Sequence, residues 1–137
     1  MRQLLAIVLL LSVIGCSKDK ENDPGKLIPE TGGIYKGTFQ RKTASGGAIV
    51  SVTLDLTGNT FSGQPATPGR YPVIGRGSYT INDNKINFVD SLYYTADFDW
   101  TLILYREYEL AKQGDSITFT RNYNNHAWDI YKLKRQQ

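Results

Sequence analysis

The chain of 137 residues is poor in the side chains that build metal and disulfide sites, because it has one cysteine and one histidine. A single cysteine excludes an internal disulfide framework, and one residue of each type excludes a zinc site of the usual cysteine and histidine kind. No stretch reaches the roughly 20 apolar residues that cross a bilayer as a helix. The length allows one domain and leaves little room for a second. We therefore expect no cofactor and no metal site.

The chain also lacks a strong excess of either charge. Sixteen basic residues against thirteen acidic ones give a net charge of +3, and loss of Arg2 with the leader described below leaves fifteen against thirteen. The basic residues are scattered through the strand-like segments rather than gathered in the stripe that capture of phosphates requires. We expect solvated exterior charges and no nucleic-acid partner.

The first fifteen residues have the pattern of a signal peptide. Met1-Arg2-Gln3 supplies a positive start, and the run from Leu4 to Ile14 is apolar apart from Ser12. Eleven residues rise about 16 Å as a helix, which is half of a bilayer core. The run is therefore the apolar region of a secretory leader rather than a membrane span.

The leader ends in Val13-Ile14-Gly15-Cys16, which resembles the lipobox of bacterial lipoproteins. The resemblance implies cleavage before Cys16, a diacylglyceryl group on its sulfur and usually an acyl chain on its new amino group. At about 0.8 kcal/mol per buried CH₂, two or three acyl chains would hold a small domain on a membrane. An ordinary secretory leader with a chance cysteine is the alternative.

Residues 16–32 are expected to form a lipidated, flexible tether. From Ser17 to Lys26 only Pro24 has an apolar side chain, so the segment buries too little surface to fold. By resemblance to Gram-negative sorting rules, Ser17 after the lipidated cysteine favours the outer membrane. Charged residues from Lys18 to Asp23 are similar to surface-export signals, which leaves the periplasmic and cell-surface faces both open.

The segment 33–137 is typical of an all-β domain, with short β-rich runs and turn residues about every ten positions and no sustained helical period. The run Ala48 to Leu56 is the clearest, because Val52, Leu54 and Leu56 alternate with polar residues. The expected strands cover Gly33 to Arg41, Ala48 to Leu56, Thr60 to Gly63, Gly75 to Ile81, Lys85 to Val89, Trp100 to Tyr105, Glu107 to Lys112, Ser116 to Arg121 and Trp128 to Arg135.

Eight or nine short strands can close as a barrel or split into a sandwich. Most of the connections are short hairpins between neighbours, whereas a sandwich needs longer crossovers, so we expect a small antiparallel up-and-down β-barrel. The strand order at Tyr105-Arg106 stays open, because neither residue suits a tight turn. The interior of an eight-stranded barrel is just wide enough for packed side chains or one small ligand, and both remain open.

Several segments of the domain resemble small bacterial lipoproteins with a lipocalin-like barrel. They are Gly33-Ile34-Tyr35, the hairpin from Val52 to Gly63, Gly77 to Ile81, Asp99 to Leu104 and Gly114 to Arg121. The resemblance implies a ligand- or partner-binding barrel without chemistry. It also implies that Tyr35 plugs one barrel end with Arg121 or Arg135 lying against it.

Candidate catalytic groups are few. His126 lies in a polar loop without a motif that would give it a nucleophile, and the closely spaced carboxylates of Asp97 and Asp99 lack the other oxygens that calcium needs. An enzyme that uses these three residues is the least favoured reading, and we expect a protein that is not an enzyme.

Aromatic residues gather in the two longest late connections and predict a rim at one barrel mouth. This set is Tyr93, Tyr94, Phe98, Trp100, Tyr123 and Trp128. Arg121 falls in phase with Ile117 and Phe119, and Lys112 in phase with Leu110, so both cations are expected to point toward the barrel axis near strand ends. An inward cation can bind a carboxylate or phosphate group.

We therefore expect a membrane-anchored, non-catalytic lipoprotein whose barrel binds a small apolar or amphipathic ligand or an envelope protein. The candidate ligand-binding residues are Tyr35, Phe88, Trp100, Arg121 and Trp128. A carrier of this kind needs a cavity along Val52, Leu54, Phe61, Tyr79, Phe88, Leu104 and Phe119. The alternative is a filled-core interaction module, either an accessory or inhibitor subunit or a glycan-binding protein, that uses the aromatic rim.

Overall fold

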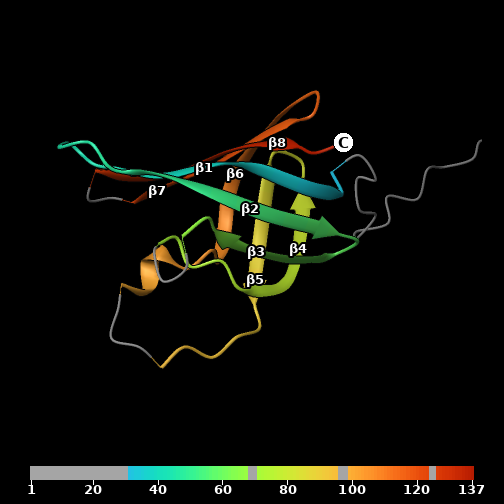
Figure 1. Cartoon of the computed structure of the whole chain (residues 1–137), viewed down its shortest axis with the longest axis horizontal. Coiled ribbons are helices and arrows are strands. Elements are labelled where there is room, and N and C mark those ends of the chain that lie inside the picture. Colours follow the sequence, from blue (N-terminus) through green and yellow to red (C-terminus); the bar gives the residue numbers. More distant parts are fainter. Residues whose placement is uncertain (1–30, 68–70, 96–98, 124–125) are drawn as a thin grey trace, which may run out of the picture.

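The computed structural model describes residues 31–67, 71–95, 99–123 and 126–137, which form a closed β-barrel (Figure 1). Each strand pairs antiparallel with its neighbours in the sequence, and the last strand closes onto the first. The strands are β1 (Gly33–Lys42), β2 (Ile49–Thr57), β3 (Thr60–Pro65), β4 (Arg76–Asn82), β5 (Lys85–Asp90), β6 (Arg106–Gln113), β7 (Ser116–Tyr123) and β8 (Ala127–Arg135). The expected all-β, up-and-down barrel is confirmed.

Alternation of side chains along each strand builds the barrel wall. In β2, Val52, Leu54 and Leu56 are buried while the residues between them contact solvent. The register places Leu54 opposite Tyr35 of β1, so apolar side chains from both strands enter the same interior. A shift of one residue would turn this whole set outward, and the alternation therefore fixes the pairing.

Three tight turns lie at one end of the barrel. They contain Gly58, Asp83 and Gly114, with φ of 60°, 50° and 57°, in the left-handed conformation that two-residue hairpins use. We call this end, where β1 starts and β8 stops, the hairpin end. The opposite end, which carries the connections β1–β2, β3–β4, β5–β6 and β7–β8, is the loop end.

Aromatic rings fill the middle of the barrel. The Phe88 ring lies 5.0 Å from that of Phe61, 5.5 Å from that of Phe119 and 6.0 Å from that of Tyr108, measured between centroids. The residues expected to line a central cavity are all buried in this cluster: Val52, Leu54, Phe61, Tyr79, Phe88, Leu104 and Phe119. Within the described chain, the interior that the sequence left open is a packed core.

The prediction of a strand from Trp100 to Tyr105, which would have made nine strands, is wrong. Residues Trp100–Leu102 form a short 3₁₀ helix, η1, because the Asp99 carboxylate accepts a hydrogen bond from the Thr101 amide and caps it. The chain then buries Ile103 and Leu104 at the loop end. The expected break at Tyr105-Arg106 is confirmed, since β6 begins at Arg106, whose φ is 70°.

The leader, Cys16 and most of the expected tether (1–30) lie outside the described residues. At its boundary with the barrel, Thr31 is buried and its carbonyl accepts a hydrogen bond of 2.9 Å from the Tyr35 hydroxyl. The last tether residues thus pack on the hairpin end. Among the described residues, no helix combines the length and apolar character needed to cross a membrane.

Candidate functional site

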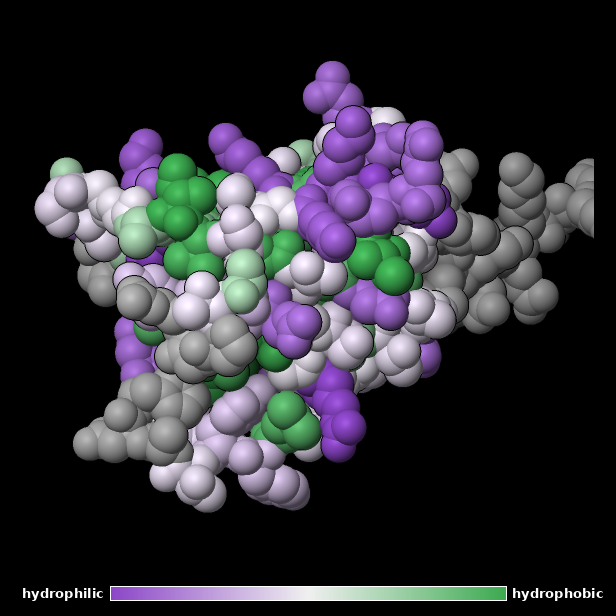
Figure 2. Space-filling model, in the orientation of Figure 1, coloured by the Kyte–Doolittle hydropathy of each residue, from purple (hydrophilic) through white to green (hydrophobic). Residues whose placement is uncertain are grey.

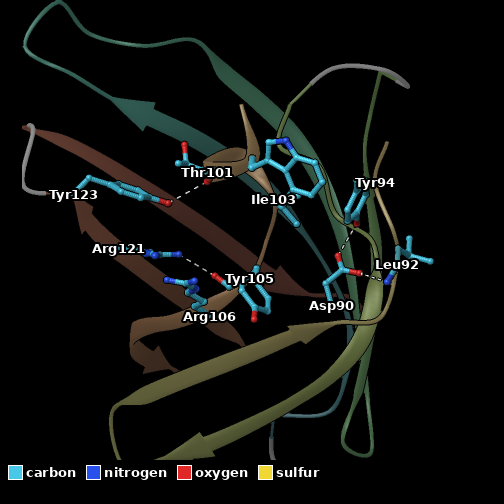
Figure 3. Close-up of a pocket in the computed structure, with 10 residues that line it drawn as sticks. Asp90, Leu92, Tyr94, Thr101, Ile103, Tyr105, Arg106, Arg121 and Tyr123 are labelled. Carbon is cyan, nitrogen blue, oxygen red and sulfur yellow. Dashed lines mark hydrogen bonds between the residues drawn. The ribbon is translucent and has the colours of Figure 1, made fainter. Parts of the chain in front are cut away.

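A pocket of about 450 Å³ opens at the loop end of the barrel (Figure 3). Its walls come from the end of β5, the described residues of the connection 91–105, the start of β6 and the end of β7. The volume lies within the ~300–1,000 Å³ range of small-molecule sites. Trp100, Ile103 and Tyr105 give it an apolar and aromatic surface.

Two arginines form one side of the pocket. Figure 3 draws Arg121 and Arg106 next to each other beside Tyr105. The Arg121 guanidinium donates a 2.9 Å hydrogen bond to the Tyr105 carbonyl and lies 4.9 Å from the centre of the Tyr123 ring. Neither arginine forms an ion pair with any described residue. This side of the pocket therefore carries positive charge that no described residue neutralises in an ion pair.

The opposite side of the pocket contains Asp90, whose carboxylate accepts hydrogen bonds from nearby residues of the chain. The Tyr94 hydroxyl donates to the Asp90 carboxylate at 2.6 Å, and the Leu92 amide donates to its other oxygen at 2.8 Å. Burial and this hydrogen bond raise the pKa of Tyr94. Gly75 makes the arrangement possible, because a Cβ at that position would collide with the Tyr94 hydroxyl. Asp90 is thus hydrogen-bonded within its own segment, whereas neither arginine forms an ion pair with a described residue.

A buried hydroxyl lies under the arginine side. Tyr108 of β6 is buried, and its hydroxyl has no hydrogen-bond partner among the described residues. The Arg121 guanidinium lies 5.9 Å from the centre of the Tyr108 ring. Burial raises the pKa of Tyr108, which keeps it a neutral donor at physiological pH.

Arg41 and Asp129 hold the pocket rim in place, and sequence reasoning missed both. Arg41 donates to the two carboxylate oxygens of Asp129 at 2.7 Å each, and also to the Thr101 hydroxyl at 2.7 Å and to the Thr101 carbonyl at 2.9 Å. The η1 helix is therefore tied to β1 and β8. One signal was available: Arg41 and Asp129 both stand in phase with inward residues of their strands, Phe39 and Tyr131.

The structure brings two of the five candidate ligand-binding residues to this pocket, Trp100 and Arg121. Tyr35 and Phe88 lie in the packed core instead, and Trp128 is exposed on the barrel exterior. Arg135 is the register partner of Tyr35, while Arg121 lies at the other end of the barrel. Of the two arginines that the family resemblance left open, Arg135 is the one beside Tyr35.

The expected aromatic rim is present in part. Tyr94, Trp100 and Tyr123 line the pocket, with the first two rings 6.2 Å apart, and Tyr93 is 99% exposed beside them. Phe98 lies outside the described residues. Lys112 shares the register of inward Ile117 but is exposed at the hairpin end, so it does not meet Arg121.

Of the candidate catalytic residues, Asp99 and His126 do not line this pocket. Asp99 accepts hydrogen bonds from Thr101 and forms an ion pair with Arg41. The hydrogen bond from the Thr101 side chain is the largest cause that lowers the pKa of Asp99. His126 is exposed at the start of β8, with φ of 63°, and Asp97 is not among the described residues. In the described part of the chain, no three His, Cys, Asp or Glu side chains gather in a way that would hold a metal ion.

Comparison with known proteins finds no family model that matches the chain. No curated protein matches it, and neither does any solved structure. Function is therefore argued from the geometry of the loop-end pocket.

Proposed function

We propose that the protein is a lipid-anchored, non-catalytic binding protein that holds a small amphipathic anion in the loop-end pocket. The observation that carries the proposal is Arg121, a half-buried guanidinium that lines the pocket and forms no ion pair with a described residue. Partial removal of a charge from water is costly unless the charge is paired. A carboxylate, sulfonate or phosphate in the pocket would supply the pair through charge-assisted hydrogen bonds.

The rest of the pocket favours an apolar body on that ligand. Trp100 and Tyr105 present rings to it, and Ile103 adds an aliphatic surface. Aromatic rings contribute large apolar areas with little loss of side-chain freedom. Because the barrel core is packed with its own rings, the ligand would lie at the mouth rather than along the barrel axis.

The anchor is compatible with an accessible pocket. The expected tether joins the barrel through Gly33 at the hairpin end, which lies opposite the loop end (Figure 1). The pocket opens at the loop end. An acylated Cys16 would thus hold the protein on the outer membrane without covering the site. Ser17 after Cys16 supports this location by its resemblance to the sorting rule.

A second candidate is an envelope interaction module that uses the same rim. Tyr93 is 99% exposed and Trp100 is 56% exposed, and Leu92 and Tyr105 are also exposed next to them. Exposed aromatic side chains of this kind often form the centre of protein or glycan interfaces. In this case a macromolecule, not a small anion, would cover the loop end.

The test compares two ligands that differ only in charge, naphthalene-2-carboxylate and naphthalene-2-carboxamide, by calorimetric titration of the full chain. We expect the carboxylate to bind about tenfold more tightly or better, because hydrogen bonds to charged groups contribute about 1.5–3 kcal/mol. Arg121→Met should remove this preference and leave carboxamide binding in place. Arg76→Met, an exposed β4 site outside the pocket, is the matched control.

The outcomes separate the candidates. Equal affinity for the two ligands would contradict anion recognition but keep a pocket for apolar molecules. Absence of binding by both ligands would contradict the small-ligand proposal. In that case, capture of an envelope protein or glycan that is lost in Trp100→Ala would favour the interaction module.

A further inference from the structure

The outward faces of β1 and β8 gather lysines that are far apart in the sequence. Lys36 pairs in register with Lys134, Thr38 pairs with Lys132, and Lys42 pairs with Trp128. All four lysines are exposed, and none forms an ion pair with a described residue. We call this surface the β1–β8 flank, defined by Lys36, Lys42, Lys132, Lys134 and Trp128.

The flank carries positive charge at a cost to the isolated barrel. Lys36 and Lys134 stand directly opposite each other, and like charges at such positions destabilise a sheet. On the β2 side, the outward acid nearest in register is Asp55, opposite Ile34, and it already accepts a hydrogen bond from Thr57. Figure 2 shows the resulting broad hydrophilic area over the end of β8. An anionic partner would offset the repulsion.

Exposed apolar side chains lie next to these lysines. Trp128 is 44% exposed, and Ile49 of β2, which pairs with Gln40 of β1, is 66% exposed. Further along β1, Ile34 is exposed as well. Tryptophan and aliphatic residues beside lysines are the combination found on protein surfaces that lie in the membrane interface.

We infer that the β1–β8 flank lies on an anionic lipid surface, with its lysines on phosphate headgroups and Trp128 and Ile49 at the interface. This inference rests on the lipid anchor proposed above. The sixteen residues 17–32 span at most about 55 Å when extended, and they end at Gly33, the first residue of β1 itself. The anchor would therefore keep this flank within reach of the bilayer.

A lipid surface fits the flank better than an acidic protein or a nucleic acid. The Lys36–Lys134 pair and the Trp128–Lys42 pair lie on the outside of a closed barrel, a convex wall. A bilayer can deform around such a wall, so that the Trp128 ring enters the interface while the lysines contact the headgroups. Each lysine near an anionic bilayer is expected to strengthen binding about fivefold.

The experiment reads contact at Trp128 separately from attachment of the chain. The full chain, purified in acylated form, carries Trp100→Phe so that Trp128 is its only tryptophan. It is mixed with vesicles of phosphatidylcholine, with or without phosphatidylglycerol, whose acyl chains carry bromine that quenches nearby tryptophan. Flotation measures how much protein is attached to the same vesicles.

We expect Trp128 to be quenched more strongly when phosphatidylglycerol is present, and less as salt is added. Lys132→Gln with Lys134→Gln should lower the contact constant about 25-fold, at about fivefold per lysine, without changing flotation. The control, Arg76→Gln with Lys85→Gln, removes the same charge from β4 and β5 and should leave quenching unchanged.

The inference would be overturned if the attached protein showed equal quenching of Trp128 with and without phosphatidylglycerol. It would also be overturned if Lys132→Gln with Lys134→Gln left the quenching unchanged. Lysine-dependent binding to polyglutamate or duplex DNA without lipid quenching would overturn it in favour of a protein or nucleic-acid partner. If the chain does not float with neutral vesicles, the proposed lipid anchor is contradicted, but contact of the flank with lipid is not. In that case concentrated anionic vesicles should still quench Trp128, and absence of quenching would contradict the inference about the flank as well.

Discussion

Arg41 and Asp129 face each other across the β1–β8 seam and form two hydrogen bonds of 2.7 Å between guanidinium and carboxylate. Asp129 is almost fully buried, and the side chain of Arg41 is 17% exposed. The remaining donors of Arg41 reach Thr101 and Asp99. One side chain thus neutralises a buried acid and also holds the η1 helix over the barrel mouth.

Arg41→Met should lower the free energy of unfolding by about 3–5 kcal/mol, because it leaves the Asp129 carboxylate buried without its cation. Urea denaturation followed by circular dichroism measures the loss.

Asp129→Asn should lower the free energy of unfolding by less, since Arg41 keeps its contacts with Asp99 and Thr101. The control is Lys85→Met, which breaks the exposed ion pair with Glu107 and should scarcely move the midpoint. Equal losses in Arg41→Met and Lys85→Met would show that the buried pair does not hold the mouth.

Phe88→Ala should lower the free energy of unfolding by about 3–5 kcal/mol, the usual cost of removing a buried ring. Phe88 is fully buried and contacts the rings of Phe61, Tyr108 and Phe119. Val89→Ala is the matched neighbour, because Val89 points outward and is 49% exposed. Urea denaturation of both variants gives the comparison. A loss for Phe88→Ala no larger than that for Val89→Ala would mean that the barrel interior is not tightly packed.

The lipid anchor makes a prediction about mass. Expressed in a Gram-negative host, the chain should lose residues 1–15 and gain the mass of a diacylglyceryl group and an acyl chain on Cys16, as measured on the detergent-extracted protein. Cys16→Ala should keep the leader or lose it without gaining lipid. A wild-type chain that is cleaved but carries no added lipid would indicate an ordinary secretory leader.

Strand alternation and turn chemistry made most of the barrel predictable. Val52, Leu54 and Leu56 show which face of β2 is buried, and Gly58, Asp83 and Gly114 stand where hairpins need a left-handed residue. The Trp100 to Tyr105 segment was mistaken for a strand because its apolar residues suit either structure. Asp99 caps the helical turn there, and Arg41, 58 positions earlier in the chain, donates a hydrogen bond to Asp99. Local secondary-structure propensity gives no information about a contact between residues so far apart in the sequence.

The site was predictable only where strand phase determines it. Arg121 follows inward Phe119 by two residues, which places it at the mouth. Trp128 was expected near the same mouth but alternates with buried Asp129 and Tyr131, so its side chain points outward. The pocket walls also include Asp90 and Tyr94, whose hydrogen bond forms in the irregular chain just after β5, where strand phase does not apply.

Buried tyrosines make the barrel sensitive to alkali. Burial is the largest cause that raises the pKa of Tyr35, Tyr79, Tyr108, Tyr123 and Tyr131 above the ordinary value of 10.0. Because the unfolded chain releases these phenolic protons more readily, this contribution to stability is complete below pH 10 and is lost as the pH rises through the raised values. Titration of phenolate absorbance should therefore show a late, cooperative step that coincides with loss of the β-sheet circular dichroism signal. Tyr131→Phe should shrink that step, whereas Tyr93→Phe, at a fully exposed position, should leave it unchanged. Ionisation of all the tyrosines in one reversible step near pH 10, with the sheet intact, would contradict the burial of these rings.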